Sequence, residues 1–261
     1  MKKWQGYKIA VLILAAVVII ETALVIYLWL GRPRKIAKKP LRVEGKIAIV
    51  IDDWGYNLNN LYILDQIKYP LTMSILPDLA YSRTIAAMLN KRGIEVILHL
   101  PMEPREKIRL EKDTILTTMD GPAIRGIINR DLDDIYYAKG VSNHMGSKAT
   151  EDSRTMTIVF EELKKRNLFF LDSFVSPKTV CFPLARKMRI GFARRDVFLD
   201  NKEEPGYIKQ QIYKLKARAK AYGEAIGIGH DRQVTLEVLK EVMPELEKQG
   251  YKFVFLSELI K

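Results

Sequence analysis

The order of apolar and polar residues divides the chain into three parts. Ile9 to Leu30 is an almost unbroken apolar run of 22 residues. As a helix it would be about 33 Å long, enough to cross the apolar core of a bilayer. The stretch from residue 31 to residue 45 is rich in proline and charge and is predicted to be a linker. From residue 46 to residue 261, short apolar runs alternate with amphipathic stretches, which predicts one folded domain.

The pattern within this domain predicts an α/β fold. The amphipathic stretches that predict helices include Arg83–Lys91, Ser153–Arg166, Ile208–Tyr222 and Thr235–Gln249. The apolar runs that predict strands are Ile47–Ile51, Leu71–Leu76, Glu95–Leu98, Gly140–Ser142, Phe169–Leu171, Gly191–Ala193, Ala225–Ile228 and Phe253–Leu256. Because strand and helix alternate, we expect parallel strands joined by crossover helices. Seven or eight such units favour a (β/α)7–8 TIM-like barrel, closed or nearly closed, with a doubly wound open sheet as the alternative.

The apolar run near the N-terminus is predicted to be a single-pass membrane anchor or an uncleaved signal. Glu21 is its one charged residue, and Tyr27 and Trp29 lie where an interfacial aromatic belt is expected. No small-x-small cleavage site follows the run, which favours an uncleaved anchor. More basic residues follow the run than precede it, and by the positive-inside rule this favours a cytoplasmic C-terminal domain.

Composition and charge exclude several classes of protein. The chain is 48% hydrophobic and 28% charged, which is ordinary for a globular protein and argues against disorder. Part of its net charge of +12 comes from the six arginines and lysines of the linker, a pattern suited to anionic lipid head groups. No nucleic-acid-binding signature is present, so a nucleic-acid partner is not expected. Cys181 is the only cysteine, so no intramolecular disulfide can form.

Polar side chains gather where the predicted strands end, the edge at which barrel active sites lie. All three histidines of the chain fall at such ends, together with several acids and one asparagine: Asp52, Asp53, His99, Glu103, Asn143, His144, Asp172, Asp196, Asp200 and His230. Some of the acids could serve instead as helix caps. Grouped carboxylates are costly unless a positive charge neutralises them. Imidazole together with carboxylate therefore predicts a divalent-metal site that suits zinc or a similar ion.

The motifs at these strand ends resemble those of the divergent polysaccharide deacetylases. They are VIDDWG, LHLPMEP, SNHMGS, RRDVFLD and IGIGH, in this order, and the resemblance covers about residues 46–261. The wider superfamily consists of barrel enzymes that remove acetyl groups from N-acetylated sugars with a bound metal. The resemblance implies an extracytoplasmic domain, opposite to the charge rule, and we follow the resemblance.

The resemblance also implies roles for single residues. The Asp-Asp pair that ends the first strand supplies a base and a metal ligand, which are Asp52 and Asp53 here. A histidine in a late motif acts as general acid, and His230 occupies that position. The family's two metal-binding histidines are spaced i and i+4. His99 matches the first, but Glu103 stands in place of the second.

The third metal ligand is therefore either Glu103 or a histidine from the next strand. Pro101 blocks a regular helix through LHLPMEP, so side chains four apart need not share a face. Glu103 is then expected to point towards substrate or Arg105. His144 keeps the ligand type, and Asn143 and Gly146 suit a tight turn that would present it. We predict His144 as the third ligand.

The leading hypothesis is a metal-dependent hydrolase that deacetylates an N-acetylated polysaccharide or cell-envelope glycan, with a divalent metal, zinc being favoured, held by Asp53, His99 and His144. Asp172 or Asp196 would orient His230 or contact sugar hydroxyls; capping, or pairing with Arg194 or Arg195, is the structural alternative. Glu103 and Asn143 would bind or orient the carbohydrate substrate. Two other classes stay open: a catalytically degenerate glycan-binding or scaffolding protein, and a glycoside hydrolase that uses Asp172 and Asp200. The sequence leaves the oligomeric state open.

Overall fold

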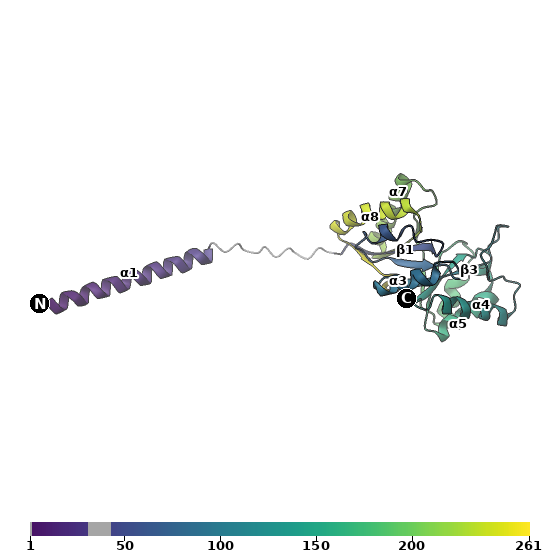
Figure 1. Cartoon of the computed structure of the whole chain (residues 1–261), viewed down its shortest axis with the longest axis horizontal. Helices are drawn as coiled ribbons and strands as arrows, with labels where there is room; N and C mark the ends of the chain where they lie inside the picture. Colours follow the sequence, from purple (N-terminus) through teal and green to yellow (C-terminus); the bar gives the residue numbers. More distant parts are fainter. Residues whose placement is uncertain (1, 31–42) are drawn as a thin grey trace. The chain divides into compact units, whose positions relative to one another are not determined.

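A computed structural model describes residues 2–30 and 43–261 of the chain (Figure 1). The chain divides into two compact units, Met1–Leu41 and Arg42–Lys261. The first contains helix α1, Lys2–Leu30, which includes the predicted apolar span. Its mean hydropathy reaches 3.0 over 18 residues, and it is long and apolar enough to cross a membrane, as a signal sequence would also be. Most of the predicted basic linker, residues 31–42, lies outside the described residues.

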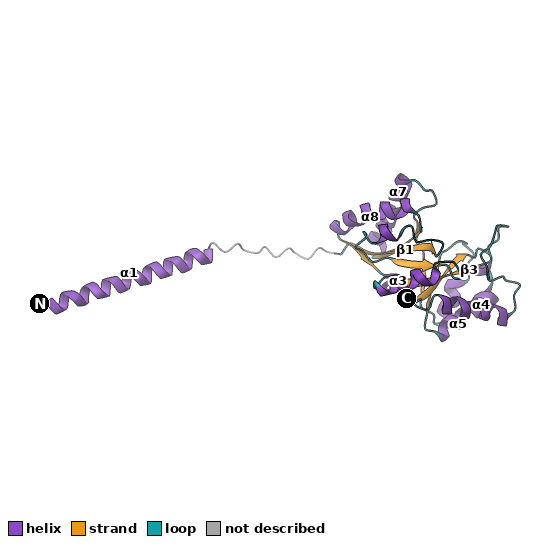
Figure 2. Cartoon of the chain, in the orientation of Figure 1, coloured by secondary structure: helices purple, strands orange, loops and turns teal. Residues whose placement is uncertain are grey.

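The second unit contains nine strands that pair in parallel and are surrounded by helices (Figure 2). The strands are β1 (Gly45–Trp54), β2 (Thr72–Ile75), β3 (Glu95–Met102), β4 (Gly140–Met145), β5 (Phe169–Asp172), β6 (Phe192–Arg194), β7 (Val197–Phe198), β8 (Glu224–His230) and β9 (Tyr251–Val254). Their order is β6-β5-β4-β3-β2-β1-β8-β7, and β9 pairs with the first half of β1. This curled parallel sheet confirms the predicted TIM-like fold class.

The helices follow the strands in the expected alternation. They are α2 (Leu61–Leu64), α3 (Ser82–Lys91), α4 (Gly121–Asp134), α5 (Ser153–Lys165), α6 (Cys181–Met188), α7 (Pro205–Tyr222) and α8 (Gln233–Lys248), with short 3-10 turns at Ala149–Glu151 and Leu256–Leu259. Figure 1 shows α7 and α8 beside one part of the sheet and α4 and α5 beside another. The four helices named from the sequence are present with ends shifted by a few residues at most.

The alternation of side chains along the strands creates two apolar layers. In β1, Ile47, Ile49 and Ile51 belong to the large cluster that the helices cover. Ala48 and Val50 point to the other face and join a smaller cluster inside the curled sheet. Because successive strand residues face opposite sides, the parity of a residue decides which layer it enters. In a regular strand, a polar residue therefore faces the interior of the barrel when it shares the parity of this inner cluster.

The barrel is not hydrogen-bonded all the way round. β6 pairs with β5 and β7 pairs with β8, whereas β6 and β7 are not paired with each other. Two residues, Arg195 and Asp196, connect them and carry the chain across the gap. The backbone N–H of Arg195 donates to Asp172 on one side, and that of Asp196 donates to Ile226 on the other. We call this gap the seam, because a groove described below runs along it.

One buried acid in the helical layer gives a stability prediction. Asp131 of α4 is 4% exposed, and its Oδ2 has no hydrogen-bond partner among the described residues. Burial raises the pKa of Asp131 to about 7, with a smaller lowering contribution from Arg130. Since its folded-state pKa lies above the unfolded value, ionisation destabilises the fold as the pH rises from about 4 to about 7. Asp131→Asn should therefore stabilise the protein at pH 8 by on the order of 2–4 kcal/mol.

The stabilisation by Asp131→Asn should disappear near pH 4, where the carboxyl is protonated in both states. Urea unfolding of wild type and variant at the two pH values measures this difference. Asp133→Asn, on the same helix at an exposed position, serves as the control. An equal or lower stability of Asp131→Asn at pH 8 would contradict the prediction.

Candidate metal centre

An irregularity in β1 brings the side chains of Asp52 and Asp53 to the same side of the sheet. Asp52 is two residues after Val50 in β1, so its side chain points to the same side as Val50, the interior of the barrel. Asp53 would normally face the helices, but its φ is 66° and the pairing of β1 with β2 shifts between Ile51 and Trp54. A bulge of this kind re-aims a side chain. Both carboxylates consequently lie at the C-terminal end of β1, on the interior side.

Two histidines reach the same region from neighbouring strands. In the pairing of β3 with β4, His99 lies opposite Ser142 and Pro101 lies opposite His144. His99 and His144 therefore share a face and are two residue pairs apart along the ladder. Their rings pack edge to face with centroids 4.9 Å apart. Met145 and Gly146, with φ values of 54° and 87°, form the turn that follows His144.

The carboxylate of Asp53 lies close to the imidazoles of both His99 and His144. Its Oδ1 lies 3.3 Å from His99 Nε2 and 3.1 Å from His144 Nδ1. Neither approach has hydrogen-bond geometry, so Asp53 Oδ1 is buried without a partner among the described residues, as is His144 Nε2. One ligand atom from each of the three residues lies within 4.8 Å of the others. A buried, unsatisfied carboxylate oxygen between two imidazoles fits a divalent cation that accepts nitrogen and oxygen ligands.

Outer contacts orient one of these imidazoles. His99 Nδ1 lies 2.7 Å from the hydroxyl of Ser142, which lies 2.7 Å from the hydroxyl of Ser74. If Nδ1 donates to Ser142, the lone pair of Nε2 faces Asp53. Histidines that bind metals are commonly held by their other nitrogen in this way. Sequence reasoning missed both serines, although their parity on β2 and β4 points them into the barrel.

The adjacent carboxylates have opposite pKa shifts. Burial raises the pKa of Asp52, and the neighbouring charge of His99 only partly offsets it. Burial also acts to raise the pKa of Asp53, but interactions with His144 and His99 outweigh it and hold that pKa far below its usual range. Asp53 is thus a permanent anion in reach of two imidazoles. Asp52 is 2% exposed and its Oδ1 has no partner among the described residues, which leaves it free to exchange a proton.

His230 stands on the opposite side of Asp52. The two residues pair directly in the ladder between β1 and β8, so both side chains face the interior. His230 Nδ1 lies 2.8 Å from Asp200 Oδ1, and the backbone N–H of His230 donates to Asp200 Oδ2 at 2.8 Å. Gly229 makes room for Thr235, because a Cβ there would lie 2.9 Å from Thr235 Cγ2, and the hydroxyl of Thr235 donates to Asp200 Oδ2. The Phe198 ring stacks on the imidazole at 5.5 Å.

The contact with Asp200 also governs the charge of His230. Burial lowers the pKa of the imidazole, but the hydrogen bond with Asp200 and its negative charge outweigh burial and raise the pKa above the usual value. Because Nδ1 is held by Asp200, the remaining nitrogen, Nε2, is the one that can exchange a proton with a ligand. His230 is therefore suited to donate a proton near neutral pH.

The orienting role expected of Asp172 or Asp196 falls to Asp200 instead. Asp172 shares the parity of Phe170, which faces the helices, and its carboxylate accepts from Phe174 N–H and Thr179 Oγ1. Asp196 crosses the seam and accepts from Ile226 N–H and Arg218. Neither acid forms the ion pair with Arg194 or Arg195 that was the structural alternative; Asp196 pairs with Arg218. All four carboxylate oxygens of Asp172 and Asp200 are engaged in hydrogen bonds within the fold, which argues against a glycosidase that uses this pair.

Glu103 and Asn143 are both engaged in structural contacts. Glu103 Oε1 lies 2.7 Å from Lys148 Nζ, and Glu103 Oε2 accepts from the backbone N–H and the hydroxyl of Thr117. It lies outside the cluster around Asp53, and Arg105, its expected neighbour, pairs with Glu151 instead. The Asn143 side chain is 1% exposed. It accepts from Ser173 N–H and donates to the carbonyl of Met145, so it shapes the turn after His144 rather than a substrate surface.

Comparison with known proteins assigns this arrangement to a family. A model of the divergent polysaccharide deacetylases matches residues 49–260, which include every residue of the centre. The chain belongs to the divergent polysaccharide deacetylase family. It is 35% identical over 204 residues to uncharacterized protein YibQ of Escherichia coli, a match that covers 78% of this chain and 64% of YibQ. The chain thus spans somewhat less than two thirds of the length of that relative.

Solved structures share the fold of this family. Uncharacterized protein ATU2773 of Agrobacterium tumefaciens superimposes with a TM-score of 0.80 at 20% identity, over 85% of this chain and 91% of that one. The Bc1960 peptidoglycan N-acetylglucosamine deacetylase gives 0.53 at 14% identity, over 84% and 89%. A mutant of BA3943, described as a CE4 family pseudoenzyme, also gives 0.53, at 17% identity over 84% and 68%. The fold is therefore common to enzymes and to a pseudoenzyme, and the reaction must be argued from the site.

Proposed function

We propose that the protein is a metal-dependent hydrolase that deacetylates an N-acetylated polysaccharide or cell-envelope glycan, and that residues 46–261 form its catalytic domain. The observation that carries the proposal is the convergence of Asp53, His99 and His144, with the unsatisfied Asp53 Oδ1 between the two imidazoles. Membership of the divergent polysaccharide deacetylase family supports this reaction class. The nitrogen and carboxylate ligands favour zinc among the divalent ions.

The residues around the centre divide the chemistry between them. A divalent ion held by Asp53, His99 and His144 would polarise the amide carbonyl and lower the pKa of a nearby water. Asp52 would accept the proton that this water loses as its oxygen bonds to the carbonyl carbon. His230 would donate a proton to the sugar nitrogen as the C–N bond breaks, so that acetate and a free amine leave the site. The contact of Nδ1 with Asp200 favours the protonated imidazole and leaves Nε2 as the nitrogen that would give up the proton.

The proposal is tested by acetate release. The full-length chain in detergent is incubated with chito-oligosaccharides and with peptidoglycan fragments, with and without added zinc, and acetate is assayed enzymatically. We expect acetate from at least one of these glycans and none after the metal is chelated. Acetate release that persists at full rate after chelation would refute a metal-dependent mechanism.

A second candidate function is that of a glycan-binding or scaffolding protein whose site no longer turns over. Glu103, which stands in place of the family's second histidine and is held by Lys148, favours this candidate. In this case oligosaccharides bind to the chain, and no acetate appears with any divalent metal. The same samples therefore separate the two functions.

We also propose that α1 anchors the protein in a membrane, with the catalytic domain on the extracytoplasmic side. Its support is the apolar span of Trp4–Leu30 and the lack of a small-x-small cleavage site after it. Full-length protein should sediment with membranes and resist extraction by high salt, since apolar burial does not depend on ionic strength. A truncated chain that begins near Gly45 should remain in the supernatant. Recovery of the uncleaved full-length chain in the soluble fraction would contradict the anchor.

A further inference from the structure

A groove follows the seam of the barrel, outside the candidate metal centre. It consists of two cavities of about 350 and about 560 Å³, which share Asp196 and Arg218 as lining residues. The first lies between β6 and the start of β8, and the second lies between β7 and α7. We call their combined surface the seam groove. The absence of pairing between β6 and β7 is what leaves this space between strand and helix.

One stripe of α7 forms a wall of the groove. Gln211, Lys214, Arg218 and Tyr222 all line it. Their spacings of three, four and four residues place them on one side of a helix. From Gln211 to Tyr222 the stripe is about 16 Å long. α7 begins soon after the C-terminal end of β7 and runs back towards the start of β8, so the groove leads away from the catalytic end of the barrel.

The end of the seam groove that lies beside β7 is linked to the candidate active site by two contacts of the Phe198 ring. The Arg195 guanidinium lies 3.9 Å from the centroid of the Phe198 ring, and that ring stacks on His230. Both Arg195 and Phe198 line the larger cavity. Phe198 thus belongs both to the wall of the larger cavity and to the surroundings of His230, so the next units of a polymer with one sugar beside His230 can extend towards the groove.

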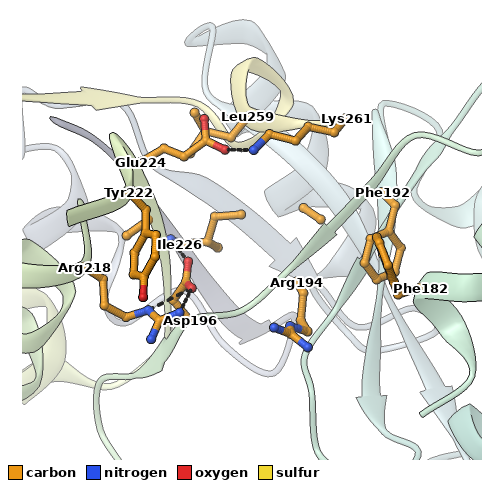
Figure 3. A pocket seen from close by; sticks show the side chains of 12 residues that line it. Phe182, Phe192, Arg194, Asp196, Arg218, Tyr222, Glu224, Ile226, Leu259 and Lys261 are labelled. Carbon is orange, nitrogen blue, oxygen red and sulfur yellow. Dashed lines mark hydrogen bonds and ion pairs between the residues drawn. The ribbon is translucent and has the colours of Figure 1, made fainter. Parts of the chain in front are cut away.

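The charge of the groove is positive. Its two acids are already paired, Asp196 with Arg218 and Glu224 with Lys261. Arg194, Arg195 and Lys214 form no ion pair with a carboxylate within residues 43–261 as described. Figure 3 shows Arg194 between the Asp196–Arg218 pair and the rings of Phe182 and Phe192. Arg194 and Lys214 are exposed, whereas the guanidinium of Arg195 donates to the carbonyls of Ser173 and Phe174. Cations without counter-charges beside exposed aromatic rings suit a ligand that has both anionic groups and flat apolar faces.

We propose that the seam groove binds the acidic part of the substrate, so that the preferred glycan of this protein carries carboxylate or similar anionic groups on sugars next to the acetylated one. This assignment rests on the proposed function, because the contact of Phe198 with His230 is what selects a glycan over an acidic peptide. Arg194 and Lys214 contact the anionic groups, Arg195 adds its positive charge, and the exposed ring of Tyr222 contacts a sugar face.

Binding without turnover tests the groove separately from the reaction. The full-length chain in detergent, with its metal removed by chelation, is titrated into fluorescent hyaluronan octasaccharide, which has a carboxylate on every second sugar. A neutral chito-octaose is the comparison probe, and anisotropy is the readout. We expect tighter binding of the acidic probe and weakening of that binding as salt is added. Equal affinity for the two probes would overturn the proposal.

Reversing the charge of Lys214 tests whether the acidic probe binds in the seam groove. Lys214→Glu should weaken binding of the acidic probe roughly threefold to tenfold, since it removes one attraction and adds a repulsion, each of modest size at an exposed position. Lys214→Gln should give a smaller loss, and neither variant should change binding of the neutral probe. Lys220→Glu makes the same change on α7 outside the groove and should have no effect. Equal losses from Lys214→Glu and Lys220→Glu would overturn the assignment.

Two further outcomes separate this inference from its alternatives. A polyglutamate peptide of matched charge should compete more weakly than the acidic oligosaccharide, and equally strong competition would assign the groove to acidic protein segments and refute a glycan subsite. Acetate release from a short neutral substrate should be unchanged in Lys214→Glu. If that activity is absent from wild type as well, the proposed reaction fails while the binding results still decide the role of the groove.

Discussion

His144→Ala is expected to abolish stoichiometric metal binding. His144 Nδ1 lies 3.1 Å from Asp53 Oδ1, and its removal leaves one imidazole and one carboxylate at the centre. Two ligands are fewer than the three that catalytic zinc sites draw from the protein. Zinc content after gel filtration, measured by elemental analysis, should fall from about one per chain to near zero. Circular dichroism checks that the fold is retained.

Glu103→Ala is the matched comparison for this experiment. Glu103 occupies the sequence position at which the wider superfamily has its second histidine, but its carboxylate contacts Lys148 and Thr117. The variant should therefore keep its metal and lose some thermal stability. Metal lost from Glu103→Ala and kept by His144→Ala would show that the carboxylate is the third ligand.

Asp52→Asn is expected to reduce acetate release by about 10²–10⁴-fold, the usual range for loss of general acid–base help. Asp52 is buried beside His99, whose Nε2 is 3.6 Å from its Oδ2, and the amide of asparagine cannot accept the proton. Because Asp53 remains, metal content should be unchanged. Turnover, elemental analysis and thermal unfolding are measured on the same preparation.

Asp196→Asn is the control for Asp52→Asn, since it changes a strand-end acid that pairs with Arg218 at the seam. It should retain nearly full turnover of short neutral substrates. Survival of normal activity in Asp52→Asn would reduce Asp52 to a structural strand-end acid and transfer the role of base to another group.

The sequence predicted the fold well because its periodicity follows directly from burial. Each predicted strand overlaps a strand of the structure, since Val, Ile and Leu are buried on both faces of a parallel sheet. β7 was missed because Val197 and Phe198 alone give no periodic signal. The absence of pairing between β6 and β7 could not be predicted from the sequence either, because strand pairing depends on the curvature of the whole sheet.

The candidate site was predicted less completely, and parity explains much of the difference. Asp172 ends a strand, but its position one residue after the inward-facing Leu171 turns it towards the helices. Parity could have excluded it in advance. The contribution of Asp53 could not have been derived by the same rule, since it depends on a positive φ at a bulge. Asp200 was noted as a strand-end acid, but its contact with His230 joins residues 30 apart.

The most direct test of the account is to titrate metal and activity together. The full-length chain is stripped of metal, zinc is added in steps from zero to three equivalents, and bound zinc and acetate release from the best glycan are measured in each sample. We predict that acetate release rises in proportion to bound zinc and stops rising at about one ion per chain, the stoichiometry of a single three-residue site. Full occupancy of the site with no acetate from any N-acetylated glycan would contradict the proposed reaction.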